Sequence, residues 1–374
     1  MLRSLSTRRG IRILVLILAT AYATVLIYQA VSAPRQQWPA DSVMTMELSN
    51  NMENTNSLEE EEEEEESEEL DKNKIKVFEV QKAIKEKISI SSSVITATAI
   101  SFSTDLDDLF ISVKTTRHYH HSRLPAIIIT WFQSAKNQTW FFTDKDDQYF
   151  QNLTNGHMIN TKCSSSHSRR ALCCKMSVEF DRFLDSGKKW FCHFDDDNYV
   201  NVPRLIKLLN NYNPRDDWYL GRPSIPAPLE IMKQYDTSSF KRSQKVKFWF
   251  ATGGAGFCIS RALALKMIPI AGGGKFISVG DRIRLPDDVT MGYIIEHLLK
   301  KKLTVVELFH SHLEPMKFLN EDTFHDQVSF SYAKGPKDEW NIVTVNGFDA
   351  KNDPNRFRSI HCRLFPRADY CSLR

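Results

Sequence analysis

Residues 190–200 constrain the fold of this chain more than any other segment, because three consecutive carboxylates follow an apolar stretch there. Residues 190–194 have the composition of a buried strand, and Asp195, Asp196 and Asp197 come directly after it. Clustered negative charge at a strand end is costly unless a cation lies nearby. Mg²⁺ and Mn²⁺ prefer oxygen ligands and bridge nucleotide phosphates. The segment therefore predicts a metal and nucleotide-diphosphate site, with a solvated acidic turn as the alternative.

Strand-like and helix-like segments alternate around this run. We expect strands at 109–113, 139–142 and 190–194, and helices at 123–132, 167–186 and 202–209. Gly187 is a stop signal for the helix before the acidic strand. This alternation predicts an α/β fold with a mostly parallel central sheet flanked by helices. Ligands of such sheets bind outside the carboxyl ends of the strands, where the aspartate triplet lies.

The amino-terminal residues predict a membrane anchor. Residues 1–12 contain four arginines and precede an uncharged stretch at 13–31. At about 1.5 Å per residue, the stretch spans roughly 28 Å as a helix, close to the thickness of a bilayer core. The arginines predict a cytoplasmic tail at 1–12, a transmembrane signal-anchor at 13–31 and a luminal remainder. A signal peptide cleaved after Ala33 is the alternative.

Residues 32–105 are predicted to form a luminal stem, because their run of glutamates at 59–66 repels itself and stays solvated. Residues 1–75 hold 7 Lys+Arg and 14 Asp+Glu, which leaves 42 and 32, or a net charge of +10, for residues 76–374. A basic domain suits an anionic substrate such as a nucleotide diphosphate. No stripe of Lys and Arg interleaves with aromatic residues, which argues against nucleic acid. We expect the catalytic domain at 106–374.

Two further segments carry residue types suited to the same chemistry. Asp287 and Asp288 follow a proline at the expected start of a helix that runs to Leu299. They are interpreted either as helix-capping carboxylates or as a pair with one member in the cleft of the aspartate triplet. Farther along, alternation places His310 and His312 on one face of a strand end. Imidazole binds Mn²⁺ beside carboxylates, although a polar surface or core histidine is the alternative.

The glycine-rich residues 248–257 lack the Lys-Ser/Thr pair of a phosphate-binding P-loop. They predict a structural turn beside an aromatic wall, whose rings are also interpreted as a surface that stacks against a sugar or base. The seven cysteines all follow the predicted anchor and form no repeated C-x-x-C pairs, so a luminal compartment favours disulfides over zinc. Sequons at Asn137 and Asn152 predict N-glycosylation.

Taken together, these segments resemble the Fringe glycosyltransferases of glycosyltransferase family 31. The matching segments are 110–116, 189–201, 248–261, 284–288, 309–314 and 355–362. They occur in order over residues 108–371, which makes the resemblance far more specific than an acidic motif alone. The resemblance implies a GT-A fold.

The resemblance also implies an activity and a location. The enzyme would be an inverting β-1,3-N-acetylglucosaminyltransferase, a single-pass type II protein of the Golgi membrane with a luminal catalytic domain. Its donor would be UDP-N-acetylglucosamine, and its cofactor would be Mn²⁺ in preference to Mg²⁺. Its acceptor would be O-linked fucose on EGF-like repeats of Notch and its ligands, so that it modulates Notch signalling. The rivals are a β-1,3-galactosyltransferase-type enzyme and an inactive luminal binding module.

Specific residues acquire expected roles from the same resemblance. Asp197 and His312 would bind the metal, Arg123 and Asp196 would bind the donor, and Asp288 would be the catalytic base. The expected disulfides are Cys163–Cys174, Cys192–Cys258 and Cys362–Cys371. These pairs leave Cys173 without a partner. It is either a free buried thiol or the partner of Cys163 in place of Cys174.

Overall fold

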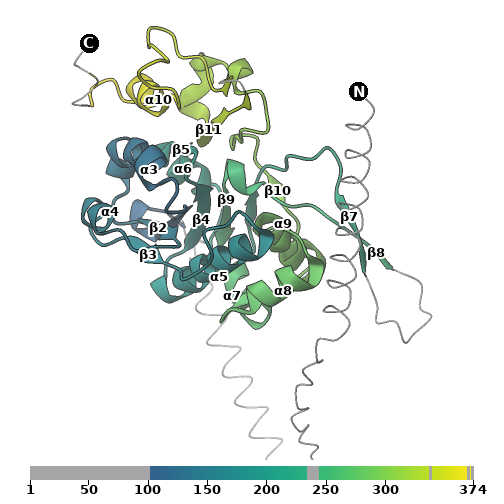
Figure 1. The fold of residues 1–374 in the computed structure, drawn as a ribbon. Coiled ribbons are helices and arrows are strands. Elements are labelled where there is room, and N and C mark those ends of the chain that lie inside the picture. Colours follow the sequence, from purple (N-terminus) through teal and green to yellow (C-terminus); the bar gives the residue numbers. More distant parts are fainter. Residues whose placement is uncertain (1–101, 234–243, 337–338, 369–370, 372–374) are drawn as a thin grey trace, which may run out of the picture. The chain divides into compact units, whose positions relative to one another are not determined.

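The computed structural model describes residues 102–233, 244–336, 339–368 and 371 (Figure 1). Contacts divide the chain into Met1–Ile95 and Thr96–Arg374, and every described residue belongs to the second unit. The predicted tail (1–12), anchor (13–31) and nearly all of the stem (32–105) therefore lie outside the described residues. Within the described part, no single helix is long and apolar enough to cross a membrane, and one bent helix pair passes by length and composition only.

Strands and helices alternate along most of the described chain. The strands are β1 (Leu109–Lys114), β2 (Thr139–Thr143), β3 (Met158–Asn160), β4 (Trp190–Asp195), β5 (Asn198–Val200), β6 (Tyr219–Gly221), β7 (Leu229–Lys233), β8 (Gln244–Phe248), β9 (Phe257–Ser260), β10 (Thr304–Val305), β11 (Ser329–Ser331), β12 (Ala333–Lys334) and β13 (Trp340–Asn341). The α-helices are α3 (His120–Ile129), α4 (Gln148–Leu153), α5 (Arg169–Ser186), α6 (Val202–Leu209), α7 (Arg261–Ala271), α8 (Lys275–Ile283), α9 (Asp287–Gly292) and α10 (Phe357–Leu364). A π-helix, Tyr293–Leu298, continues α9, and short 3₁₀ turns include Gly253–Ala255 and Met316–Phe318.

The central sheet has the strand order β10-β6-β9-β4-β1-β2-β3. β1 is parallel to both β4 and β2, β2 is parallel to β3, and β6 is parallel to β10. Only β9 is antiparallel to its neighbours, β4 and β6, within this described sheet. The predicted α/β fold with a mostly parallel central sheet is therefore confirmed. Because β1 and β4 are parallel and in register, Lys114 lies directly beside Asp195 at their carboxyl ends.

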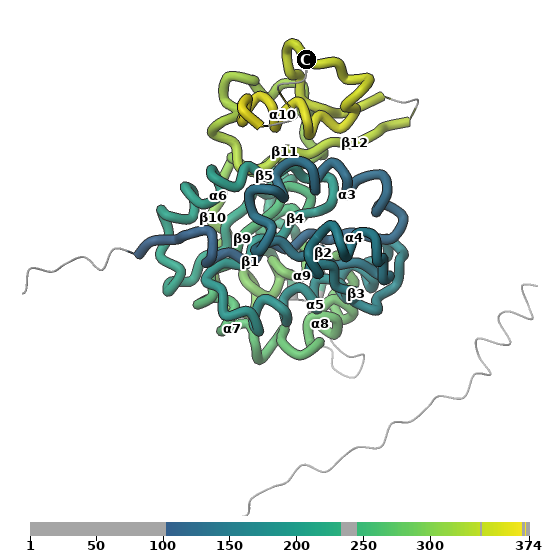
Figure 2. The backbone as a smooth tube through the Cα atoms, turned by 90° about the vertical axis from the view of Figure 1, so that its left-hand side faces the viewer, coloured from purple at the N-terminus to yellow at the C-terminus, as the bar shows by residue number. Residues whose placement is uncertain are grey.

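Two apolar cores cover the two faces of the sheet. Alternate residues of β1 enter opposite cores: Ile111 packs with α3 and α6 on one face, and Phe110 packs with α5, α7 and α8 on the other. Figures 1 and 2 show α5, α7 and α8 together below the sheet, and α3, α6 and the carboxyl-terminal residues around α10 above it. A sheet enclosed in this way leaves its strand ends as the accessible edge.

Local sequence signals account for most helix boundaries. α5 begins where the Ser168 hydroxyl accepts the Ala171 N–H and ends at Gly187, which adopts a left-handed φ of 70°. α6 has the predicted bounds, with Asn201 as its N-cap. The helix predicted at 123–132 instead begins at His120 and gives way to a 3₁₀ turn, Trp131–Ser134.

The prediction of a strand that carries His310 and His312 on one face is wrong. Strand β10 ends at Val305, and both histidines lie in the irregular chain that follows it. The chain turns because the carbonyl of Leu308 accepts from the N–H of Val328 at 2.9 Å, instead of continuing the pairing with β6. The two imidazoles consequently lie in different surroundings. His310 is buried against Gln327 and Glu314, whereas His312 lines a cavity of about 660 Å³.

Three disulfides are present, with the pairing implied by the resemblance: Cys163–Cys174, Cys192–Cys258 and Cys362–Cys371. Cys192 and Cys258 face each other across the antiparallel strands β4 and β9. Cys173 is a free buried thiol, so the alternative pairing with Cys163 is not adopted. The predicted glycosylation residues Asn137 and Asn152 are both exposed.

Candidate active site

One cavity of about 660 Å³ lies at the carboxyl ends of β1 and β4. Its volume is typical of a small-molecule site. All five residues predicted for catalysis, metal binding and donor binding line it: Arg123, Asp196, Asp197, Asp288 and His312. They come from α3, from the turn after β4, from the start of α9 and from the loop after β10. The sheet and its crossover helices thus bring together residues that are up to 189 positions apart in the sequence.

The three consecutive aspartates point to three different environments. Asp195 ends β4 and forms an ion pair with Lys114, at 3.0 Å between Oδ1 and Nζ. Asp196 binds Thr115 and Arg123, and Asp197 lies near His312. The turn that separates them is fixed by Asn198, whose Oδ1 accepts the N–H of Asp195 at 2.9 Å. A solvated acidic turn is therefore excluded, since Asp196 and Asp197 are 4% and 7% exposed.

Asp196 and Arg123 form the most tightly bonded pair of the cavity. The guanidinium donates to Asp196 Oδ1 at 2.5 Å and to Asp197 Oδ2 at 3.4 Å. The Thr115 hydroxyl donates to the second oxygen of Asp196 at 2.7 Å. Arg123 also stacks on the ring of Tyr119, 3.7 Å from the centroid, which fixes the plane of its guanidinium. A planar cation held at a cavity wall is suited to binding phosphate oxygens.

Asp197 and His312 lie close enough to bind one ion. His312 Nδ1 is 3.6 Å from Asp197 Oδ2, and two metal–ligand bonds of about 2.1 Å reach up to roughly 4.2 Å between ligand atoms. The other oxygen of Asp197, Oδ1, is buried and has no hydrogen-bond partner. Burial, together with the charges of Asp195 and Asp196, raises the pKa of Asp197 well above its ordinary value. Burial lowers the pKa of His312, which favours the neutral imidazole that metals bind.

The described residues contain no group of three or more His, Cys, Asp or Glu side chains arranged around one metal position. The pair Asp197–His312 therefore offers two protein ligands, and a bound divalent cation would take its remaining ligands from water or from substrate. Phosphate-bridging cations are commonly bound in this way, by one or two protein groups plus phosphate oxygens. A carboxylate with one unpartnered oxygen, whose other oxygen lies 3.6 Å from an imidazole nitrogen, fits such an ion.

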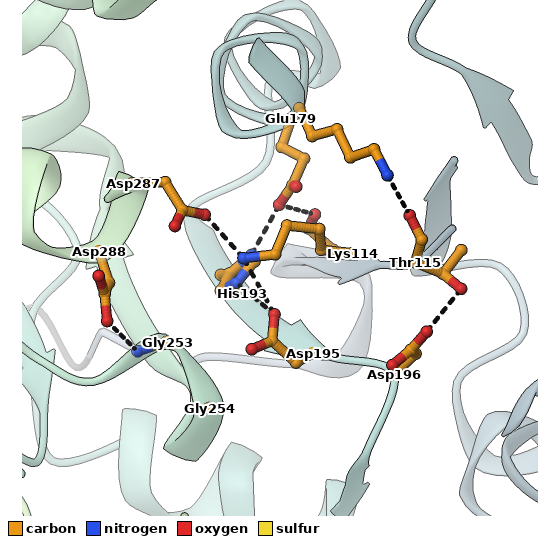
Figure 3. A network of polar contacts seen from close by, with 12 residues as sticks. Lys114, Thr115, Glu179, His193, Asp195, Asp196, Gly253, Gly254, Asp287 and Asp288 are labelled. Atoms are coloured by element: carbon orange, nitrogen blue, oxygen red, sulfur yellow. Dashed lines mark hydrogen bonds and ion pairs between the residues drawn. The ribbon is translucent and has the colours of Figure 1, made fainter. Parts of the chain in front are cut away.

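Asp287 and Asp288 begin α9 and point in different directions (Figure 3). Asp287 is buried and receives a hydrogen bond from Lys114 Nζ at 2.7 Å. Asp288 lines the cavity, where its two oxygens accept the N–H groups of Gly253 at 3.2 Å and Val289 at 2.7 Å. Burial, followed by the charge of Asp287, raises the pKa of Asp288 to about 6. Asp288 is thus an oriented carboxylate with the basicity expected of a general base near neutral pH.

Lys114 is the functional residue that the sequence interpretation missed. Figure 3 shows its ammonium group between Asp287 and Asp195, so it links α9 to the acidic turn after β4. Burial by itself would lower the pKa of Lys114, but these two carboxylates raise it well above the ordinary value. One signal was available: Lys114 follows the predicted strand 109–113, and parallel pairing with strand 190–194 places it beside Asp195.

A second buried network lies beneath Asp195. His193 Nδ1 and the Ser112 hydroxyl both contact Glu179 Oε2 at 2.6 Å, and His193 Nε2 lies 3.5 Å from Asp195 Oδ1. Burial opposes the charged imidazole, but Glu179 raises the pKa of His193 to about 9. The cationic His193 and Lys114 together therefore stabilise the ionised Asp195.

The glycine-rich residues form the predicted structural turn. Gly253–Ala255 is a 3₁₀ turn, and its Gly253 N–H donates to Asp288. The interpretation of the aromatic wall as a stacking surface is wrong. Phe248 and Phe250 are buried in the core, and neither they nor Trp249 line the cavity.

Comparisons with known proteins show the family to which this chain belongs. A family model described as Fringe-like matches residues 104–368. The Fringe glycosyltransferase of Drosophila melanogaster is 66% identical over 285 residues, which cover 76% of this chain and 68% of that protein. β-1,3-N-Acetylglucosaminyltransferase radical fringe of Gallus gallus is 53% identical over 270 residues, or 72% of each chain. Lunatic fringe of Danio rerio is 49% identical over 71% of this chain and 70% of that protein. The chain belongs to the Fringe family.

A solved structure of a glycosyltransferase involved in the glycosylation of the major capsid of PBCV-1 is also similar. It aligns with a TM-score of 0.32 and 11% identity, over 67% of this chain and 98% of that chain. A TM-score this low supports no argument about the fold.

Proposed function

We propose that this chain is an inverting glycosyltransferase of the GT-A type that uses UDP-N-acetylglucosamine. It transfers N-acetylglucosamine in β-1,3 linkage to O-linked fucose on EGF-like repeats, notably those of Notch. Two relatives, 53% and 49% identical, are named β-1,3-N-acetylglucosaminyltransferases. The observation that carries the proposal is the single cavity in which Arg123, Asp196, Asp197, His312 and Asp288 meet.

Asp197 and His312 are proposed to hold Mn²⁺, with Mg²⁺ as a weaker substitute. The unpartnered Oδ1 of Asp197 and the 3.6 Å between Asp197 and His312 support this assignment. A divalent cation there would act as a Lewis acid that stabilises the charge on the departing diphosphate. Arg123 and Asp196 would bind the donor on the same side, Arg123 through its guanidinium and Asp196 as an acceptor of donor hydroxyl groups.

Asp288 is proposed to be the catalytic base. It takes the proton from the 3-hydroxyl of fucose while that oxygen forms a bond to C1 of N-acetylglucosamine. The bond from C1 to the phosphate oxygen breaks at the same time, and UDP leaves with the electron pair. One base is sufficient because attack from the face opposite UDP inverts C1 directly. The hydrogen bonds from Gly253 and Val289 orient the carboxylate for this step.

Lys114 is a positioning residue in this scheme. Its ion pair with Asp287 fixes the first turn of α9, and its ion pair with Asp195 fixes the turn that carries Asp196 and Asp197. One buried cation thus sets the placement of the base relative to the donor-binding carboxylates.

We also propose that residues 1–12 are cytoplasmic, that residues 13–31 anchor the chain in the Golgi membrane and that residues 32–105 form the luminal stem. The arginines before an uncharged stretch of bilayer length support this proposal. The three disulfides support a luminal catalytic domain, since oxidising compartments preserve such bonds.

A transfer assay with an O-fucosylated EGF-like repeat tests the proposed activity. The expected result is transfer from UDP-N-acetylglucosamine that requires Mn²⁺ and is abolished by a chelator. Preference for UDP-galactose would assign the chain to the rival galactosyltransferase class, and no transfer from any UDP-sugar would favour a binding module.

The metal assignment has its own prediction. Asp197→Ala removes one of the two proposed protein ligands of the metal. We therefore expect the Mn²⁺-dependent affinity for UDP, measured by calorimetry, to fall by at least about 10-fold, because even the loss of a group that only supports a metal ligand costs this much. Asp185→Ala is the control, because Asp185 is an exposed carboxylate on α5 that does not line the cavity. Unchanged UDP binding by Asp197→Ala would remove the residue from the metal site.

A further inference from the structure

Two exposed apolar side chains lie within six residues after His312 in the sequence. Phe318 and Leu313 are 76% and 64% exposed, the highest values among the large hydrophobic residues of the described chain. Single exposed apolar residues are ordinary on a protein surface. These two are unusual because they flank a short segment that begins next to a cavity residue.

The segment that carries them is held rigidly. Asn341 Nδ2 donates to the carbonyls of His312 and Glu314, both at 2.8 Å, and Asn341 Oδ1 accepts the N–H of Met316 at 2.9 Å. The Met316 side chain is buried and fastens the segment to the core. Apolar groups on a fixed backbone bind a partner with little loss of conformational entropy.

Two smaller cavities connect this segment to the candidate active site. A cavity of about 130 Å³ shares Thr252 and Leu313 with the main cavity. A third cavity, of about 480 Å³, shares Arg222 and Glu314 with the second and extends to Phe318. Ion pairs of 3.0 Å from Arg222 to Glu307 and to Glu314 hold the wall between them. The three cavities therefore adjoin one another in a row along residues 313–319.

The row meets the main cavity at Thr252 and at Leu313, which follows His312. Thr252 adjoins Gly253, whose N–H binds the proposed base Asp288, whereas the proposed donor-binding pair Arg123–Asp196 does not line the two smaller cavities. A fucose that offers its hydroxyl to Asp288 is attached to a folded polypeptide, which must lie against the surface just outside this position. Leu313 and Phe318 are the apolar anchors available there, and such anchors dominate protein–protein binding energies.

We propose that Leu313, Phe318 and the two smaller cavities bind the polypeptide part of the acceptor, the EGF-like repeat itself. The inference rests on the proposed function and extends it from the fucose to the protein that carries the fucose. It assigns to residues 313–319 a role in substrate selection separate from the transfer chemistry.

The test compares two acceptors that differ only in the polypeptide: an O-fucosylated EGF-like repeat and 4-nitrophenyl α-fucoside. For Phe318→Ala, we expect kcat/KM with the repeat to fall by about 5- to 10-fold, mainly through KM, because an interface anchor is lost. The value with the simple fucoside should change by less than about 2-fold, since no polypeptide reaches Phe318. Leu313→Ala should likewise lose more with the repeat than with the fucoside.

Leu265→Ala is the matched control, because Leu265 is 48% exposed on α7 and lines none of the three cavities. It should leave both values unchanged. An equal loss of kcat/KM with both acceptors, or no loss with the repeat, would overturn the inference. The inference would also be overturned if the variant lost activity because its oligomeric state had changed. A wild-type protein inactive on both acceptors would instead refute the proposed function.

Discussion

At the scale of single residues, the environment of each carboxylate decides its chemistry. Asp195, Asp196, Asp197 and Asp288 lie in one cavity, yet their partners differ. Asp195 contacts two cations, and although burial opposes it, Lys114 and His193 lower its pKa. Asp288 accepts hydrogen bonds from backbone N–H groups alone, and burial, followed by the charge of Asp287, raises its pKa. Groups whose pKa values are pushed apart in this way are suited to different roles.

The raised pKa of Asp288 predicts a pH dependence. A base acts only when it is deprotonated, so kcat/KM should rise with pH and level off above about 6. The groups that face Asp288 are Asp287, which raises this pKa, and Lys114 with the N–H groups of Gly253 and Val289, which lower it. The pH profile of kcat/KM at saturating Mn²⁺ measures the midpoint. A flat profile between pH 5 and 8 would contradict the assignment of Asp288 as the base.

Lys114→Met tests the positioning role. Loss of the ammonium removes a charge that lowers the pKa of Asp288, so the acidic midpoint of the pH profile should move upward from about 6. The change also leaves Asp195 and Asp287 buried without their cation, at a cost of about 3–5 kcal/mol in the free energy of unfolding.

The control for this prediction is Lys189→Met. Lys189 forms a surface ion pair with Asp108, is 46% exposed and should contribute at most about 1 kcal/mol. If Lys114→Met alters stability without moving the pH midpoint, Lys114 supports only the fold.

At the scale of elements, the sequence predicts those helices and strands whose bounds depend on residues close together in the chain. Runs of apolar residues marked β1, β2 and β4, and the Gly187 stop marked the end of α5. The loop after β10 was not predictable, because hydrogen bonds to distant residues such as Val328 bend it. Alternation predicted the wrong backbone for His310 and His312, and the role expected of His312 came from the resemblance alone. The placement of Lys114 beside Asp195 depends on the pairing of β1 with β4.

The turn Gly253–Ala255 offers a test at this scale. Gly256, directly after it, has a φ of +86°, and a Cβ there would lie 2.3 Å from the Phe194 ring. Gly256→Ala should therefore lower the free energy of unfolding by about 2–4 kcal/mol, because strain adds to overpacking, and should impair transfer by moving Gly253 away from Asp288. Denaturant unfolding and the transfer assay measure both effects.

Gly273→Ala is the matched control, with a φ of +63° and no atom within 4 Å of the new Cβ. It should cost about 1 kcal/mol from backbone strain alone and leave transfer intact. Equal losses in the free energy of unfolding for the two variants would show that the contact with Phe194 contributes nothing to the effect of Gly256→Ala.

At the scale of the whole molecule, the described unit brings acidic and imidazole groups from distant segments to one edge of a parallel sheet. The strand pattern was sufficient to place the aspartate triplet at that edge, because the carboxyl ends of parallel strands share an edge. The convergence of Asp288 and His312 on the triplet was expected from the resemblance instead, since one begins a helix and the other lies in a loop. The sequence was insufficient to predict the row of cavities along residues 313–319, which depends on how Asn341 holds a loop from another part of the chain. The proposed binding site for the acceptor polypeptide and the proposed site of sugar transfer consequently lie next to each other on one surface.

The most direct test of the central claim is the behaviour of Asp288→Asn, which keeps the shape of the side chain and removes its basicity. We expect transfer to an O-fucosylated EGF-like repeat to fall by about 10²- to 10⁴-fold, the usual contribution of a general base. Mn²⁺-dependent binding of UDP, measured in the same preparation, should remain at the wild-type affinity. Transfer within a few-fold of wild type would contradict the claim that this cavity pairs a metal-bound diphosphate with Asp288 as the proton acceptor.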